Sequence, residues 1–258
     1  VVNVTITGKN DAPSISIDSN NQDSASSQLN ESNSSLTSSG SLSIADPDLS
    51  SSSFSPSVLS VSSSGTTDGL TSNNQALLDM LQLNAGAISR AEASLDWTFN
   101  SGSENFNYLA SGESLTLTYN INVADDQDAT DISSVVITIN GTNDGIQLAN
   151  ADTAITSGTI SELVDGSNNE LTASLSSSGF FSLTDLDFSD SNAVSITSSS
   201  STSTQLTTGQ ATLGTLSPSV HTPTTDGATG RVEWTYSVND SAVDYLAENQ
   251  TITESFTI

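Results

Sequence analysis

Residues 2–12 read VNVTITGKNDA, and residues 135–145 read VVITINGTNDG. Each stretch alternates apolar and polar side chains, then reaches a glycine and an Asn-Asp pair. Alternation with a period of two is typical of a strand with one buried face, and Gly, Asn and Asp favour turns. The return of the same strand and turn 133 residues later indicates a tandem repeat.

Three further landmarks recur in the same order, and all four lie 133 to 139 residues apart. GSLSIADPD at 40–48 returns as GFFSLTDLD at 179–187, LDWTF at 95–99 as VEWTY at 232–236, and YLA at 108–110 as YLA at 245–247. We therefore expect one repeat over residues 9–142 and a second over 143–258. Residues 1–8 read as the last strand of a preceding module, and the second repeat is expected to stop before its own last strand.

The alternation predicts an all-β fold of two tandem Greek-key β-sandwiches of immunoglobulin type. Trp97 and Trp234 are expected in their cores, and one short helix over 74–83 interrupts the first. The strands of the first repeat are predicted near 13–17 with a second piece near 29–32, then near 40–45, 54–61, 86–90, 94–100, 114–123 and 133–140.

The composition excludes several classes of function. Thirty acidic residues face only Lys9, Arg90 and Arg231, for a formal charge of −27. Binding to nucleic acid or to an anionic membrane needs clustered cations, so neither is expected as a partner. The chain has no cysteine, which excludes disulfides and thiolate metal sites. So strong an acidic excess repels itself, and the folded chain should benefit from bound cations.

The acidic residues cluster at predicted loop ends. Consecutive strands of such a sandwich run in opposite directions, so the segment before the first strand and every second loop meet at one end. Ca²⁺ takes six to eight oxygen ligands and suits flexible loops. We therefore predict Ca²⁺ as the cofactor, and one end of the first repeat collects Asn10, Asp11, Asp46, Asp48, Asp125, Asp126 and Asp128.

A second predicted group is shared between the repeats, where cations would fix the angle between neighbouring modules. The alternative is that these Asp and Asn residues only form turns, for which both are favoured. Gln250 stands where the first repeat has Glu113, so the corresponding lower site of the second repeat departs from the pattern. The candidate ligands of the second group are Glu31, Glu113, Asn143, Asp144, Asp185 and Asp187, and Glu162 is a further candidate in the second repeat.

The linked set of motifs resembles the VCBS repeat, a cadherin-like module of large RTX-type bacterial adhesins. It comprises Gly-Thr-Asn-Asp at 141–144, Gly…Thr-Asp-Leu-Asp at 179–187, Trp-Thr-Tyr-Ser-Val at 234–238 and Tyr-Leu-Ala at 245–247. The resemblance implies type I secretion, a cell-surface location and a role in cell adhesion and biofilm formation. The repeat would be an extender that projects an adhesive tip. The cadherin-like scheme also places Asp144, Asp185 and Asp187 around Ca²⁺.

Catalysis is not expected. His221, the single histidine, lies in a loop-like stretch without an obvious partner, and the motifs of common nucleophiles and phosphate loops are absent from the sequence. The expected partners are neighbouring repeats of the same chain and host or biofilm surface ligands, and the chain is expected to be a monomer. The alternative function is glycan binding by the Ser/Thr-rich stretches near 60–72 and 198–229.

Overall fold

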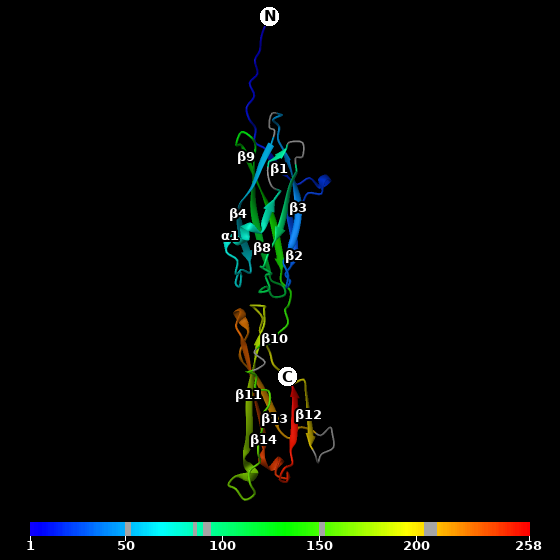
Figure 1. The fold of residues 1–258 in the computed structure, drawn as a ribbon, viewed down its shortest axis with the longest axis vertical. Helices are drawn as coiled ribbons and strands as arrows, with labels where there is room; N and C mark the ends of the chain where they lie inside the picture. Colours follow the sequence, from blue (N-terminus) through cyan, green and yellow to red (C-terminus); the bar gives the residue numbers. More distant parts are fainter. Residues whose placement is uncertain (50–52, 85–86, 90–93, 150–152, 204–210) are drawn as a thin grey trace. The chain divides into compact units, whose positions relative to one another are not determined.

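The computed structural model describes residues 1–49, 53–84, 87–89, 94–149, 153–203 and 211–258. The chain divides into a first unit, Val1–Asp144, and a second unit, Gly145–Ile258. Strands are the main secondary structure of each unit, and the helices are few and short, which confirms the all-β prediction (Figure 1). None of the helices in the described ranges has the length and apolar character needed to cross a membrane.

The first unit holds two sheets. One sheet has the order β1-β3-β7-β5 and the other the order β2-β9-β8-β4-β6. Apart from β2 and the short strand β5, these elements fall where the alternation predicts them, and β6 lies within the strand predicted near 86–90. Their bounds are β1 Ser14–Ser16, β2 Ser26–Asn30, β3 Thr37–Ala45, β4 Ser53–Gly65, β5 Leu81–Leu83, β6 Ile88–Ser89, β7 Ser94–Asn100, β8 Ser114–Ala124 and β9 Thr130–Asn140. The rest of the strand predicted near 86–90 lies largely outside the described residues.

The core of the first unit lies between these sheets. Every second residue of β7, of β8 and of the second half of β9 is buried, and Trp97 is fully buried as predicted. The Phe99 and Tyr119 rings, one from each sheet, meet edge to face with centroids 6.4 Å apart. Burying such a side chain is worth about 1.5–3 kcal/mol, so the alternating apolar residues stabilise the sandwich. They are Leu95, Trp97, Phe99, Leu115, Leu117, Tyr119, Ile121, Val123, Val135, Ile137 and Ile139.

The first strand of the unit is split between the two sheets. β1 pairs antiparallel with β3, and β2 pairs parallel with β9. The 3-10 turn η1, Ser19–Asn21, lies between them and is capped by Asp18, whose side chain accepts a hydrogen bond from Asn20 N. The second piece is expected near 29–32 but β2 begins three residues earlier, because its serines pair through the backbone and carry little apolar alternation.

The predicted helix over 74–83 is too long. Helix α1 covers Asn74–Asp79, with Asn73 as its N-cap, and the chain then turns into β5, which pairs with β7. Leu77, Met80 and Leu81 are all buried, so the apolar run does face the core as expected. Pairing with β7 satisfies the backbone of 81–83, which outweighs the helix propensity of three residues.

The second unit has a four-stranded sheet, β10-β11-β14-β13, and a two-stranded sheet, β12-β15. The Tyr236 and Phe256 rings, 6.0 Å apart between centroids, join the two sheets. Short 3-10 turns η3 Glu170–Thr172, η4 Thr225–Gly227 and η5 Asp240–Ala242 connect strands. The strands are β10 Gln147–Ala149, β11 Ser174–Thr184, β12 Ser198–Ser203, β13 Thr215–Thr222, β14 Gly230–Asn239 and β15 Ile252–Thr257.

The same Gly–Trp packing occurs in both units. Gly40 lies opposite Trp97 in the pairing of β3 with β7, and Gly179 lies opposite Trp234 in the pairing of β11 with β14. Trp97 Nε1 donates to Ser24 O at 2.8 Å, and Trp234 Nε1 donates to the Ile155 carbonyl oxygen at 2.7 Å. Trp234 is therefore a core residue too, and the repeat seen in the sequence extends to side-chain packing.

Glu254 is in phase with the apolar Ile252 and Phe256 of β15, which the sequence leaves unexplained. Its carboxylate accepts hydrogen bonds from the Tyr236 hydroxyl at 2.8 Å and from the backbone N–H groups of Leu213 and Gly214. Burial, and then the Glu254 carboxylate, raise the pKa of the Tyr236 hydroxyl well above its usual range. Glu254 therefore holds the segment before β13 against the second sheet.

Candidate cation sites

Five predicted ligands meet at one end of the first unit. Asn10 Nδ2 donates to Asp125 Oδ2 at 2.8 Å, Asp11 N donates to Asp48 Oδ2 at 2.6 Å, and Asp48 N donates to Asp46 Oδ1 at 2.7 Å. Asn10 and Asp11 precede β1, Asp46 and Asp48 follow β3, and Asp125 follows β8. The structure therefore brings together side chains from three separate segments, as the alternation of loops predicts.

These carboxylates also form turns. Asp125 Oδ1 accepts from Gln127 N at 2.8 Å and from Ala129 N at 2.9 Å. The hydrogen bond from Asn10, followed by those from the two backbone N–H groups, lowers the pKa of Asp125 against the opposing effect of burial. Asp126 and Asp128 are exposed, and Asp128 has a φ of 66°. Some of the predicted ligands therefore also stabilise turns, which is the alternative that the sequence leaves open.

The second predicted group divides between the units. At the opposite end of the first unit, the buried Glu31 accepts through Oε1 from the hydroxyl and the N–H of Thr142, the latter at 3.1 Å. Glu113 Oε2 accepts from Ala110 N at 3.0 Å. Asn143 Nδ2 bonds to Asp144 O at 2.8 Å in the segment that follows. A cation shared between the units stays a prediction.

In the second unit, Asp185 and Asp187 follow β11 and are both buried. Asp187 N donates to Asp185 Oδ1 at 3.3 Å, which repeats the Asp48-to-Asp46 bond of the first unit. The Asp-x-Asp elements of both repeats therefore fold the same way. In each, the first carboxylate turns back to the backbone of the second.

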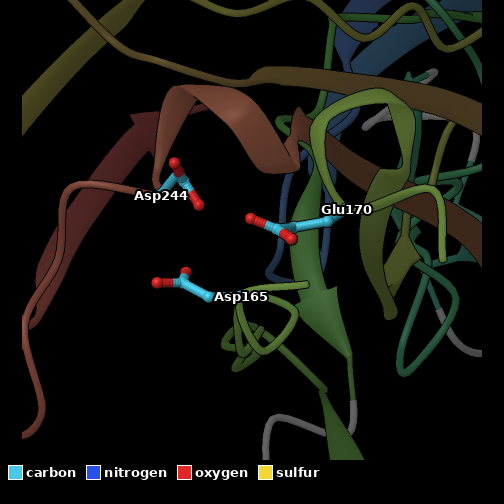
Figure 2. A group of neighbouring side chains, drawn as sticks. All are labelled: Asp165, Glu170 and Asp244. Carbon is cyan, nitrogen blue, oxygen red and sulfur yellow. The ribbon is translucent and has the colours of Figure 1, made fainter. Parts of the chain in front are cut away.

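The most tightly clustered acidic side chains among the described residues lie in the second unit. The sequence predicts none of these three as ligands, only the nearby Glu162. Asp165, Glu170 and Asp244 each place one carboxylate oxygen within 4.8 Å of the other two, and Figure 2 shows their side chains pointing toward one another. Asp165 and Glu170 bracket the loop before β11, and Asp244 follows η5. Asp165-Gly166 reads as an ordinary turn, so the sequence offers no signal that it meets Asp244.

His221 has a partner after all. Its Nδ1 lies 3.6 Å from Glu233 Oε2, and Arg231 Nη2 lies 3.1 Å from Glu233 Oε1. All three side chains are well exposed on β13 and β14. Arg231 and Glu233 form a surface ion pair beside His221, and pairs of this kind contribute little to stability.

Neither a family model nor a curated protein matches the chain. Among solved structures, the C-terminal domain of the AgI/II polypeptide BspA of Streptococcus agalactiae is similar over 95% of each chain, with 9% identity and a TM-score of 0.19. With so low a TM-score, we infer nothing about this chain from that similarity. The β-sandwich assignment is based on the sheets and the buried core of the chain itself.

Proposed function

We propose that the chain is a structural extender of a secreted bacterial surface adhesin, stiffened by Ca²⁺ at the ends of its modules. A rod of β-sandwich modules is supported by the tandem repeat and by the Gly–Trp packing that occurs in both units. No cysteine is present to cross-link the modules. Its cell-surface location, its secretion and its support of adhesion and biofilm formation follow from the resemblance to VCBS repeats.

The observation that carries the proposal is the meeting of Asn10, Asp11, Asp46, Asp48 and Asp125 at one end of the first unit. Asn10 and Asp11 lie in the segment that leads into the module, so a cation held there would fasten that segment to the sandwich. Carboxylate and amide oxygens in flexible loops are the ligands that Ca²⁺ takes. The total charge of −27 gives a further reason for cations to favour the folded chain.

The test is thermal unfolding in millimolar Ca²⁺ and in excess chelator. A cation that binds only the folded state at 100 times its Kd adds about 2.7 kcal/mol for each site. For a domain of this size each kcal/mol raises Tm by about 4 °C, so one such site in a unit would raise its Tm by about 10 °C.

The variant Asp46→Asn with Asp48→Asn keeps an oxygen for the Asp48 N–H but removes two charges. It should unfold near the wild-type temperature in chelator and lose much of the rise in Ca²⁺. The control is Asp68→Asn with Asp79→Asn, which removes two charges from exposed positions of the same unit. Equal Ca²⁺ responses in both variants would refute the proposal.

A further inference from the structure

The second unit carries an acidic group that the proposed module-end sites do not include. Asp165 and Glu170 belong to one loop, closed by the hydrogen bond from Gly166 N to Glu170 Oε2 at 2.5 Å. Gly166 has a φ of 81° and Asn169 a φ of 67°, which fixes the turn that brings the loop's two acidic ends together. Asp244 approaches from the other side of the group (Figure 2).

A buried carboxylate beside this group points to a ligand. Asp240 is fully buried; its Oδ1 accepts from Leu163 N at 2.8 Å, and its backbone oxygen accepts from Asp244 N at 3.1 Å. Asp240 Oδ2 and Glu162 Oε2 are also buried, and neither has a hydrogen-bond partner among the residues that the structure describes. A buried carboxylate oxygen without a donor is strongly unfavourable unless a cation or a proton satisfies it.

Repulsion within the group points the same way. Burial raises the pKa of Glu162, and the negative charges of Asp244, Asp240, Asp165 and Glu170 raise it further. Arg231, the one Lys or Arg of the second unit, pairs instead with Glu233, and the single histidine, His221, lies beside the same Glu233. No protein cation therefore neutralises the five carboxylates within the described residues of this unit.

The first unit serves as an internal comparison. Asn107 precedes Tyr108-Leu109-Ala110 as Asp244 precedes Tyr245-Leu246-Ala247, so the two residues correspond. Glu31 has the Asn107 amide beside its Oε2, 3.1 Å away, whereas Glu162 of the second unit has the charged Asp244 nearby. At the position of Asp240, the first unit uses the neutral Ser101, which donates its N–H to Leu36 O as Asp240 donates to Ala173 O. The second unit thus has carboxylates at two positions, Asp240 and Asp244, where the first unit has the neutral Ser101 and Asn107.

We infer that Glu162, Asp165, Glu170, Asp240 and Asp244 form a Ca²⁺ site contained within the second unit. All five offer carboxylate oxygens, and Ca²⁺ takes six to eight oxygen ligands in less strict geometry than Mg²⁺ demands. Asp240 and Glu162 supply the buried oxygens, and the loop and Asp244 supply the exposed ones. The site goes beyond the proposed function, because it needs no neighbouring module and no residue of the first unit.

Isothermal titration of the full 258-residue chain with CaCl₂, after chelator has been removed, tests the inference. Asp165→Asn with Asp244→Asn should lose one binding event, or weaken it at least tenfold, relative to the charge-matched Asp68→Asn with Asp79→Asn. Asp46→Asn with Asp48→Asn should leave that binding event unchanged. The single variant Asp244→Asn recreates the first unit's amide, so it should fold and should melt at a higher temperature than wild type in chelator.

The outcomes separate this site from the module-end sites. Loss of binding only in the Asp165/Asp244 variant supports the inference and leaves the proposed function without support. Loss only in the Asp46/Asp48 variant supports the proposed function and overturns the inference. Wild-type affinity and stoichiometry in the Asp165/Asp244 variant would overturn the inference whatever the other variants do.

Discussion

Gly179→Ala should destabilise the second unit strongly. A Cβ at residue 179 would lie 2.5 Å from Trp234 Cζ2 and closer still to the Ile155 carbonyl oxygen, which accepts the indole N–H. Overpacking of this kind costs about 1–3 kcal/mol, and the displaced indole hydrogen bond adds about 1 kcal/mol. Alanine restricts the unfolded chain and returns about 0.4–1 kcal/mol, so we expect a net loss of about 2–3 kcal/mol.

Urea unfolding followed by tryptophan fluorescence and circular dichroism measures this loss as a shift of the second unit's transition. The control is Gly145→Ala, where an added Cβ would meet no atom within 4 Å and φ is not positive. Gly40→Ala should produce the equivalent shift in the first unit, because a Cβ there would lie 2.6 Å from Trp97 Cζ2. Values for Gly179→Ala and Gly145→Ala within about 0.5 kcal/mol of each other would refute the packing argument.

Two further predictions concern single carboxylates. Burial alone would raise the pKa of Asp23, but hydrogen bonds led by that from Asp18 N outweigh it and lower the pKa. A lowered folded-state pKa stabilises the fold above the ordinary Asp value and loses this contribution as the pH falls through the folded pKa. Asp23→Asn should therefore reduce the free energy of unfolding at neutral pH by about 1 kcal/mol. The effect should be smaller below pH 3.8, the ordinary pKa of Asp, and urea unfolding at several pH values measures it. Glu254→Ala should lower the free energy of unfolding by about 2 kcal/mol, because it leaves the Tyr236 hydroxyl and two N–H groups without their acceptor. Tyr236→Phe should lower it by about half as much. No change in stability for Glu254→Ala would contradict this role.

The strands of the first unit could be predicted from the sequence because their apolar residues alternate clearly. The period of two in 114–123 and 94–100 sets both strand positions and buried faces. The prediction was less accurate where this signal is weak. The Ser-rich β2 begins early, and Leu81–Leu83 forms a strand because β7 offers it an edge, which no local pattern shows.

Of the two candidate cation sites, one could be predicted from the sequence and the other could not. The meeting of Asn10, Asp46 and Asp125 follows from strand order alone, because antiparallel strands bring alternate loops to one end. Strand order does not predict that the Asp165–Glu170 loop meets Asp244. Their contact depends on the path of loops whose residues show no apolar alternation. Its one local sign is the Asp-Gly turn, which is also what an ordinary surface loop shows.

Small-angle X-ray scattering in Ca²⁺ and in excess chelator tests most directly whether bound Ca²⁺ stiffens this chain, as we propose. Samples in Mg²⁺ at equal ionic strength control for general screening of the −27 charge. We expect an elongated monomer with a well-defined maximum dimension in Ca²⁺, and a broader distribution of distances in chelator and in Mg²⁺. The same scattering curve under all three conditions would contradict it.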